Sequence, residues 1–322
     1  MLSVRFEYLH PWPNQVGFYM ARAKGLYEQY GIDPEFFSGD ESRGDTAAVL
    51  ARGEYDVALV RLNQLYFHQQ GEASLIAVGV MNQCQVGGII TNKSTGITRF
   101  RDLEGRKVCV PLHVDRLLTE LRQAVEADGG DFSKLDIVDP GNWEPDMRAI
   151  ERGDFEAVIN VPWWEAFQGS QPFDQVVTLA FDDVDAVKHP SYYVAVRREM
   201  LDRQPNLVRN FMRATAEGYR MVKEDPEEAV RVMQTPMRYI APYVLRAAIN
   251  ATMPTWFDGN GYWGTADLGL IREYTKWMDK AGHLSVPLDD ALASLDGGCI
   301  TNAFLPHCDE EPPAPLGLHF VG

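Results

Sequence analysis

The first residues that could do chemistry lie in a proline-rich stretch, HPWPNQ at residues 10–15. Proline keeps such a stretch out of a helix. A tryptophan beside an imidazole and amides suits stacking on a planar heteroaromatic ring and hydrogen bonding to it. We therefore predict that His10, Trp12, Asn14 and Gln15 contact a ligand. In the structural alternative, Trp12 fills the edge of a core and His10 caps a backbone group.

Charged and amide side chains follow other predicted strands. Arg61 could hold a carboxylate, sulfonate or phosphate through a bidentate pair, or form an ordinary ion pair with Glu54 or Asp56. Asp40 and the backbone donors of its loop suit an anion at the start of a helix, unless the loop is only a solvated turn. The amides that could hydrogen-bond a heterocycle are those of Asn63, Asn82, Gln83 and Gln85.

A second group of candidates lies further along the sequence. His113 stands in a turn before a predicted helix, for which the neighbouring Asp115 is the expected cap. Two tryptophans and a carboxylate after the strand that ends at Asn160 would form an aromatic wall with a polar anchor, or else belong to a hydrophobic core. The ligand contacts predicted from this group are His113, Trp163, Trp164, Glu165, His189 and Tyr192.

Three histidines raise a catalytic alternative. If His10, His113 and His189 met across a cleft, they could act as acid and base or hold a metal. No HxH or HExxH pair supports a metal, and no GxSxG elbow supports a serine nucleophile. The sequence also has no Walker loop and no GxGxxG before a helix. We therefore predict no metal and no cofactor.

The composition excludes several classes of protein. The chain has 322 residues, and 30 Lys and Arg against 46 Asp and Glu give a formal charge of −16. This balance argues against a nucleic-acid partner, which needs clustered cations to neutralise phosphates. With 45% hydrophobic and 24% charged residues, the chain should form about two globular domains, as a monomer or dimer. The longest apolar stretch, residues 75–81, is too short to span a membrane.

The N-terminus and the cysteines bear on the cellular compartment. Residues 1–14 contain no basic region, no apolar leader segment and no cleavage site. This predicts a cytoplasmic protein, or a periplasmic or cell-envelope protein from which a leader has been removed. The four cysteines have no metal-type spacing, although Cys299 and Cys308 are near enough in sequence for a disulfide. The alternative is two thiols.

The elements that must position these residues alternate between strand and helix. The hydrophobic pattern predicts strands at 4–9, 32–37 and 55–60, with helices at 16–30 and 46–52 between them. Such alternation indicates an open α/β sheet. Ligands of these sheets bind at loops beyond the carboxyl ends of the strands, which is where most of the candidates fall.

An internal repeat indicates two such sheets. Residues 50–60 (LARGEYDVALV) and 150–160 (IERGDFEAVIN) share the order apolar, variable, Arg, Gly, acidic, aromatic, acidic and an apolar strand. We predict two Rossmann-like α/β lobes joined by crossover hinge strands near 87–92 and 192–197, with a cleft between them. Lobe 1 comprises 1–90 and 195–305, lobe 2 comprises 91–194, and 306–322 form an irregular tail. Trp256, Tyr262 and Trp263 would close the mouth of the cleft or pack beneath it.

Several segments together resemble a known family. PNQVGFYMARAKGLYEQYGIDPEF, LARGEYDVALV, FRDLEGRKVCVP and ITNAFLP follow in order the signatures of the THI5/NMT1-like branch of type II periplasmic binding proteins, over roughly residues 4–306. The resemblance implies the type II architecture. It also implies a role such as that of the substrate-binding subunits of ABC importers for thiamin-pyrimidine precursors, alkanesulfonates or riboflavin, with an ABC permease as partner if the protein is exported.

Enzymes of the same branch depend on residues that this sequence lacks. Pyrimidine-precursor synthases carry consecutive cysteines in the returning strand, which here is HPSYYVAV, and a donor histidine at a position closest to Gln64, with His68 a turn further on. Aromatic sulfinate desulfinases carry a cysteine after the first strand, but the first cysteine here is Cys84. The resemblance therefore favours a binding protein for a planar heteroaromatic or anionic solute. The alternative is a cytoplasmic enzyme acting on an aromatic or pyrimidine-like substrate.

Overall fold

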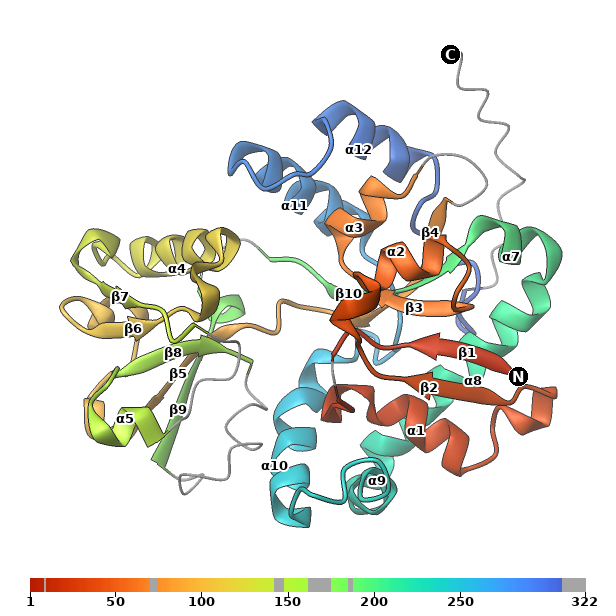
Figure 1. Ribbon diagram of the computed structural model, residues 1–322, viewed down its shortest axis with the longest axis horizontal. Coiled ribbons are helices and arrows are strands. Elements are labelled where there is room, and N and C mark those ends of the chain that lie inside the picture. Colours follow the sequence, from red (N-terminus) through yellow and green to blue (C-terminus); the bar gives the residue numbers. More distant parts are fainter. Residues whose placement is uncertain (9, 70–73, 142–147, 162–174, 185–187, 309–322) are drawn as a thin grey trace. The chain divides into compact units, whose positions relative to one another are not determined.

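The computed structural model describes the chain except residues 9, 70–73, 142–147, 162–174, 185–187 and 309–322 (Figure 1). The described chain forms two compact units. Unit 1 comprises Met1–Gln83, Pro190–Met237 and the described residues from Trp256 onward, and unit 2 comprises Cys84–His189 and Arg238–Thr255. The chain therefore leaves unit 1 after Gln83 and returns to it at Pro190, then leaves again after Met237 and returns at Trp256.

Unit 1 is built on a five-stranded mixed sheet in the order β2-β1-β3-β10-β4. Its strands are β1 (Leu2–Arg5), β2 (Pro34–Phe37), β3 (Val57–Val60), β4 (Leu75–Asn82) and β10 (Ser191–Arg197). β1 runs parallel to β2 and β3, whereas β10 runs antiparallel to both β3 and β4. The carboxyl ends of four strands and the start of β10 consequently share one edge of the sheet.

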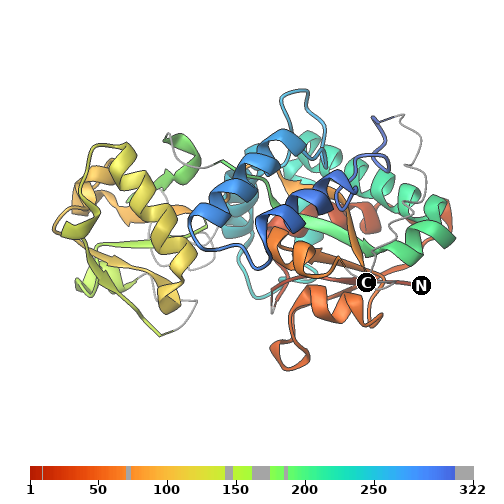
Figure 2. The ribbon, with the colours of Figure 1, turned by 90° about the horizontal axis from the view of Figure 1, so that it is seen from above.

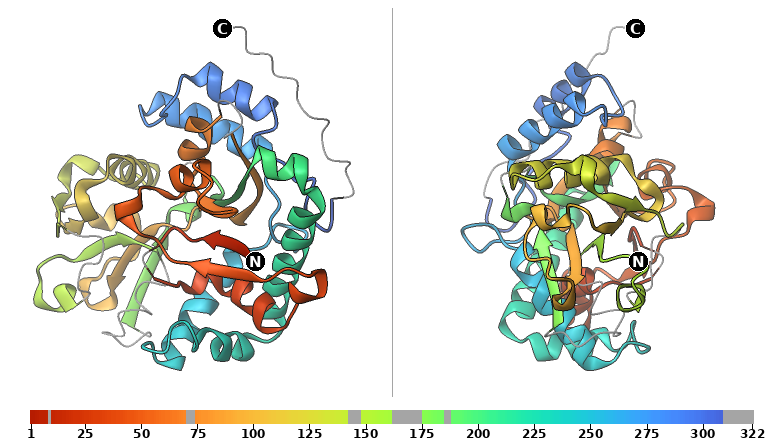
Figure 3. Two further views of the ribbon diagram at one scale, coloured as in Figure 1. Left: turned by 45° about the vertical axis from the view of Figure 1, so that its right-hand side comes forward. Right: turned by 90° about the vertical axis from the view of Figure 1, so that its left-hand side faces the viewer.

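Helices cover both faces of this sheet, with α1 and α8 on one face and α2 and α3 on the other (Figures 1 and 3). The helices of the unit are α1 (Val16–Ala23), α2 (Thr46–Ala51), α3 (Leu62–Phe67), α7 (Arg198–Arg203), α8 (Pro205–Glu224), α9 (Pro226–Met233), α11 (Leu268–Lys280) and α12 (Leu288–Asp296). The close crossing of α1 and α8 depends on Gly17 and Gly218, because a Cβ on Gly218 would overlap the Gly17 carbonyl oxygen.

Unit 2 repeats the arrangement with the sheet order β7-β6-β8-β5-β9 (Figure 1; Figure 2 gives the view from above). Its strands are β5 (Gly88–Asn92), β6 (Lys107–Cys109), β7 (Asp136–Val138), β8 (Ala157–Asn160) and β9 (Val176–Ala180), and its helices are α4 (Asp115–Ala127), α5 (Arg148–Arg152) and α10 (Pro242–Thr252). β6 is parallel to β7 and β8, and β5 is antiparallel to β8 and β9. Its core packs around Leu103, Val108, Leu121 and Phe181.

The internal repeat occupies equivalent places in the two sheets, since β3 and β8 are each the middle strand. In both copies the glycine is left-handed, with φ of +76° at Gly53 and +77° at Gly153. The next N–H donates back to the preceding helical turn, from Glu54 to Val49 O at 3.1 Å and from Asp154 to Ala149 O at 2.9 Å. The prediction of two similar α/β lobes is confirmed.

Several predicted elements differ in extent. The first strand ends at Arg5 rather than residue 9, and the first helix ends at Ala23, because Gly25 takes a φ of +66°. The predicted crossover strands each belong to a single sheet, β5 to unit 2 and β10 to unit 1. The connections between the units are instead the segments around residues 83–87, 188–190, 237–238 and 255–256.

Three further expectations concern a disulfide, the late aromatic residues and membrane-spanning segments. All four cysteines lie in the described part of the chain, and no two of them form a disulfide there. Trp256 and Trp263 are buried within unit 1 and Tyr262 stacks on His307, so the two tryptophans pack beneath the surface. Among the described helices, none has the length and apolar character needed to cross a bilayer.

Candidate functional site

One polar and aromatic cluster lies at the carboxyl edge of the unit 1 sheet. We call it the Glu7 cluster, and it consists of Glu7, Tyr8, Trp12, Arg61 and Tyr192. The first three follow β1, Arg61 directly follows β3, and Tyr192 is the second residue of the antiparallel β10. Because these ends meet at the same edge, residues far apart in the sequence come together there.

An ion pair forms the charged part of the cluster. Arg61 Nε lies 2.5 Å from Glu7 Oε1, and the Glu7 side chain is only 12% exposed while that of Arg61 is half exposed. The Glu7 carboxylate raises the pKa of Arg61 above its ordinary value, so the guanidinium stays charged. The predicted ion pair of Arg61 with Glu54 or Asp56 is thus replaced by a pair with Glu7. An incoming anion would have to compete with that carboxylate for Arg61.

Three aromatic rings form the rest of the cluster. Tyr8 stacks on Trp12, and its hydroxyl is hydrogen-bonded to the hydroxyl of Tyr192. Burial raises the pKa of Tyr8 well above its ordinary value, and the nearby Tyr192 and Glu7 raise it further. The phenol therefore stays protonated and acts as a hydrogen-bond donor or acceptor rather than as a base.

Backbone strain marks the edges of both sheets. Tyr192 has a φ of +57° within β10, and Leu112 has a φ of +55° in the turn after β6. Each is a bulky non-glycine residue in a conformation that costs about 1–2 kcal/mol. Strain of this kind persists where the surrounding structure fixes it, and it concentrates at ligand sites.

Amides in the proline-rich stretch hold the loop in place. Asn14 and Asn82 are fully buried and exchange two amide hydrogen bonds of 2.9 Å, and Trp256 Nε1 donates to Asn14 Oδ1 at 2.7 Å. Gln15 Oε1 accepts a 3.1 Å hydrogen bond from the backbone N–H of Trp12. In the structure, these side chains predicted to contact a ligand form hydrogen bonds within the protein. Those hydrogen bonds fix the position of Trp12.

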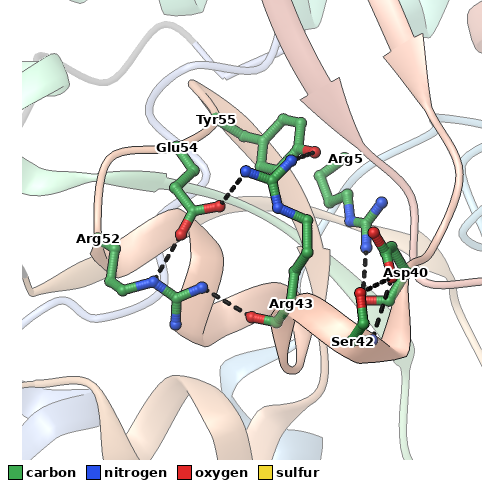
Figure 4. A network of polar contacts seen from close by, with 7 residues as sticks. All are labelled: Arg5, Asp40, Ser42, Arg43, Arg52, Glu54 and Tyr55. Atoms are coloured by element: carbon green, nitrogen blue, oxygen red, sulfur yellow. Dashed lines mark hydrogen bonds and ion pairs between the residues drawn. The ribbon is translucent and has the colours of Figure 1, made fainter.

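The loop after β2 is also held internally (Figure 4). The Asp40 carboxylate accepts hydrogen bonds from the N–H and hydroxyl of Ser42, at 3.1 and 2.6 Å. Beside it, Glu54 pairs with both Arg43 and Arg52, at 2.9 and 2.6 Å. Asp40 is therefore the capping group of a surface turn in this structure, which matches the alternative weighed for it.

The Asn63 side chain hydrogen-bonds to the loop after α11 and not to the Glu7 cluster. Its Nδ2 donates to the carbonyl oxygen of His283 at 2.5 Å, and its Oδ1 accepts from the backbone N–H of Ser285 at 3.0 Å. The side chain thus fastens the loop after α11 to the start of α3. His10, by contrast, lies beside Trp12, with its Nδ1 3.1 Å from the carbonyl oxygen of Pro11.

A second cluster lies within unit 2. We call it the Glu120 cluster, and it consists of Gln85, Arg116, Glu120 and His189. Glu120, on α4, is 3% exposed and forms an ion pair with Arg116. Gln85 Nε2 donates to its Oε2 at 2.7 Å, and His189 Nε2 lies 3.8 Å from its Oε1.

The balance of forces keeps the Glu120 carboxyl ionised at neutral pH. Burial by itself raises the pKa of this carboxyl, but Arg116 and His189 oppose that effect and the net direction is downward. A buried carboxylate that remains charged needs such partners. Arg116 supplies one from the same helix, and His189 and Gln85 supply the others from two of the segments that connect the units.

The remaining predicted contacts are distributed as follows. Trp163, Trp164 and Glu165 lie outside the described residues, as does the side chain of His113, while Gln83 is half-buried. Of the three histidines in the catalytic alternative, His10 belongs to unit 1 and the other two to unit 2. In the described part of the chain, no group of three His, Cys, Asp or Glu side chains could hold a metal ion.

Sequence reasoning did not select Glu7, Tyr8, Arg116 or Glu120. The hydrophobic pattern places Glu7 and Tyr8 inside the first predicted strand, whereas the observed strand ends at Arg5 and leaves both residues in the loop. Glu120 and Arg116 have the i, i+4 spacing of an ordinary surface pair. In the structure Glu120 is buried and contacts Gln85 and His189, whereas Arg116 stays partly exposed.

Comparisons with known proteins were made against families and solved structures. The family model described as "NMT1/THI5 like" matches residues 12–229. A search of curated proteins finds no match.

Three similar structures are a sulfonate-binding, a nitrate-binding and a desulfurization protein. The periplasmic aliphatic sulphonate binding protein SsuA from Escherichia coli has a TM-score of 0.65 at 14% identity, covering 90% of this chain and 91% of that one. The periplasmic nitrate-binding protein NrtA from Synechocystis PCC 6803 has a TM-score of 0.64 at 14% identity, covering 94% and 86%. The desulfurization enzyme DSZB has a TM-score of 0.64 at 14% identity, covering 94% and 97%. At these identities the likeness establishes a shared fold, and function must be argued from the site.

Proposed function

We propose that this chain, which belongs to the NMT1/THI5-like family and has the type II periplasmic binding fold, is a solute-binding protein. The observation that carries the proposal is the Glu7 cluster. It gathers an ion pair, two phenols and an indole at the sheet edge where α/β proteins bind ligands. The strained Tyr192 within it supports the same placement.

We further propose that the solute is a planar heteroaromatic compound with hydrogen-bonding groups, such as a thiamin-pyrimidine precursor. The Glu7 carboxylate already neutralises Arg61, so the cluster has no net positive charge with which to hold a simple oxyanion. Tyr8 and Trp12 instead offer ring faces and edges, and Glu7 can accept hydrogen bonds from ring N–H or amino groups. An organosulfonate is the competing ligand class, and it would require Arg61 to separate from Glu7.

The proposal includes two properties expected from the family. The two units would close over the solute, and the loaded protein would deliver it to an ABC permease. Small-angle X-ray scattering with and without the solute tests closure, for which the radius of gyration should fall on loading. An unchanged radius would contradict closure and leave the binding proposal to be tested by affinity.

The identity of the solute is best tested on gently purified protein. Native mass spectrometry should show a small molecule bound to the intact chain, and its release with an unchanged mass supports a binding protein. Conversion of that molecule to a product of different mass during incubation would contradict the proposal and favour the enzymatic alternative.

Two substitutions test the assignment of the site. Arg61→Gln breaks the ion pair with Glu7, and Tyr192→Phe removes the hydroxyl bound to Tyr8. Each should weaken solute affinity roughly tenfold, which corresponds to about 1.4 kcal/mol. The matched control is Arg52→Gln, which breaks the ion pair with Glu54 outside the Glu7 cluster and should leave affinity unchanged. Wild-type affinity in both test variants would remove the Glu7 cluster from the site.

A further inference from the structure

We infer that Glu120 is a positioning residue that anchors two of the four segments connecting the two units. Gln85 belongs to the outgoing segment and His189 to the returning one, and both side chains meet the same buried carboxylate of α4. One oxygen of Glu120 accepts from Gln85, and the other faces His189 and Arg116. Two stretches far apart in the sequence are thereby fixed to one helix of unit 2.

On the unit 1 side, the same two segments are fixed by different partners. Asn82 pairs with the buried Asn14, and the hydroxyl of Tyr192 is hydrogen-bonded to that of Tyr8. Each connection is thus fastened within unit 1 at one end and within unit 2 at the other. On the unit 2 side, Gln85 and His189 both contact Glu120, so loss of the Glu120 carboxylate should loosen both segments at once.

The chemistry of the anchor depends on its charge. A carboxylate offers two acceptor oxygens, and hydrogen bonds to an ionised acceptor are about twice as strong as neutral ones. An amide at the same position keeps the size of the side chain but offers a single acceptor oxygen. Glu120→Gln is therefore the substitution that weakens the anchoring with the smallest change in packing.

Hydrogen exchange of the backbone tests the anchoring without any solute. In Glu120→Gln, amides of 83–87 and of 189–192 should both exchange at least about tenfold faster, while those of β6 keep their wild-type rate. The control is Glu126→Gln, an exposed residue of the same helix, which should change neither segment. Wild-type rates in both segments, or equal acceleration throughout unit 2, would overturn the inference.

A pair of further variants separates anchoring from general stability. Gln85→Met should accelerate exchange in 83–87 only, because His189 keeps its own contact with Glu120. Gln85→Glu combined with Glu120→Gln exchanges donor and acceptor across the 2.7 Å bond, and should restore slow exchange in 83–87 but not in 189–192. Failure of this rescue would mean that Glu120 only fills space.

The consequence for ligand binding rests on the proposed function. Tyr192 of the Glu7 cluster follows one of these segments, and Asn82, which pairs with Asn14 in the loop of Trp12, precedes the other. Glu120→Gln should therefore weaken solute affinity about three- to tenfold. Unchanged affinity together with faster exchange would overturn the role of Glu120 in binding. If the wild-type chain binds no solute at all, the proposed function fails, and the exchange measurements still decide the anchoring.

Discussion

Asn14 provides the most direct test of how the loop beneath the candidate site is held. We predict that Asn14→Ala lowers the free energy of unfolding by about 3–5 kcal/mol, since three buried polar atoms lose a partner. These atoms are Oδ1 and Nδ2 of Asn82 and Nε1 of Trp256, at 2.9, 2.9 and 2.7 Å from the Asn14 amide. A buried group left without its hydrogen bond costs about 1–3 kcal/mol, and a water molecule entering the vacated space offsets part of the sum.

The assay is urea unfolding followed by tryptophan fluorescence, because Trp256 contacts the substituted residue and Trp12 lies in the same loop. The midpoint should fall while the slope of the transition stays constant. Asn260→Ala, at an exposed loop position, is the control and should stay within about 0.5 kcal/mol of wild type. In the double variant with Asn82→Ala, the two losses should overlap by at least about 1 kcal/mol. A loss below about 1 kcal/mol, or strict additivity, would refute the account.

Four further predictions concern the thiols and the glycines. Burial raises the pKa of the Cys109 and Cys299 thiols to about 12, so at pH 8 roughly one in ten thousand is ionised. Iodoacetamide should label them at least about 100-fold more slowly than in urea; equal rates would contradict their burial. Because their folded-state pKa is raised, the stability they contribute is present below pH 9 and declines as the pH rises toward 12. Gly218→Ala should lower the free energy of unfolding by about 1–3 kcal/mol, because the new Cβ overlaps the Gly17 carbonyl. Gly259→Ala, with open space around it, is the control and should have no such effect. Equal urea midpoints for the two variants would refute the close crossing of α1 and α8. Gly53→Ala and Gly153→Ala should each lower the free energy of unfolding by about 1 kcal/mol, because both repeats require a left-handed residue at this position. Unequal losses would show that the two turns differ.

The sequence determined the architecture because the relevant signals are local. Hydrophobic alternation and glycine positions place a strand after each RG-acidic-aromatic unit, and the two copies at residues 50–60 and 150–160 occupy the middle of two similar sheets. The same reasoning places Arg61 near a ligand edge, because side chains that follow parallel strands share an edge whatever the detailed packing. The sequence places Tyr192 on the returning strand, and only the antiparallel direction of β10 brings the start of that strand to the same edge.

Only the tertiary structure decided which polar groups already have hydrogen-bond or ion-pair partners within the protein. Whether Arg61 meets Glu7, or Asn14 meets Asn82, depends on where separate strands end and how they are ordered, and no local pattern specifies either. The same holds for Glu120, which has the spacing of a surface ion pair and is buried by the connecting segments that bring Gln85 and His189 onto it. The type of a side chain limits its chemistry, but burial and long-range partners decide whether that chemistry holds the fold or remains available for a solute.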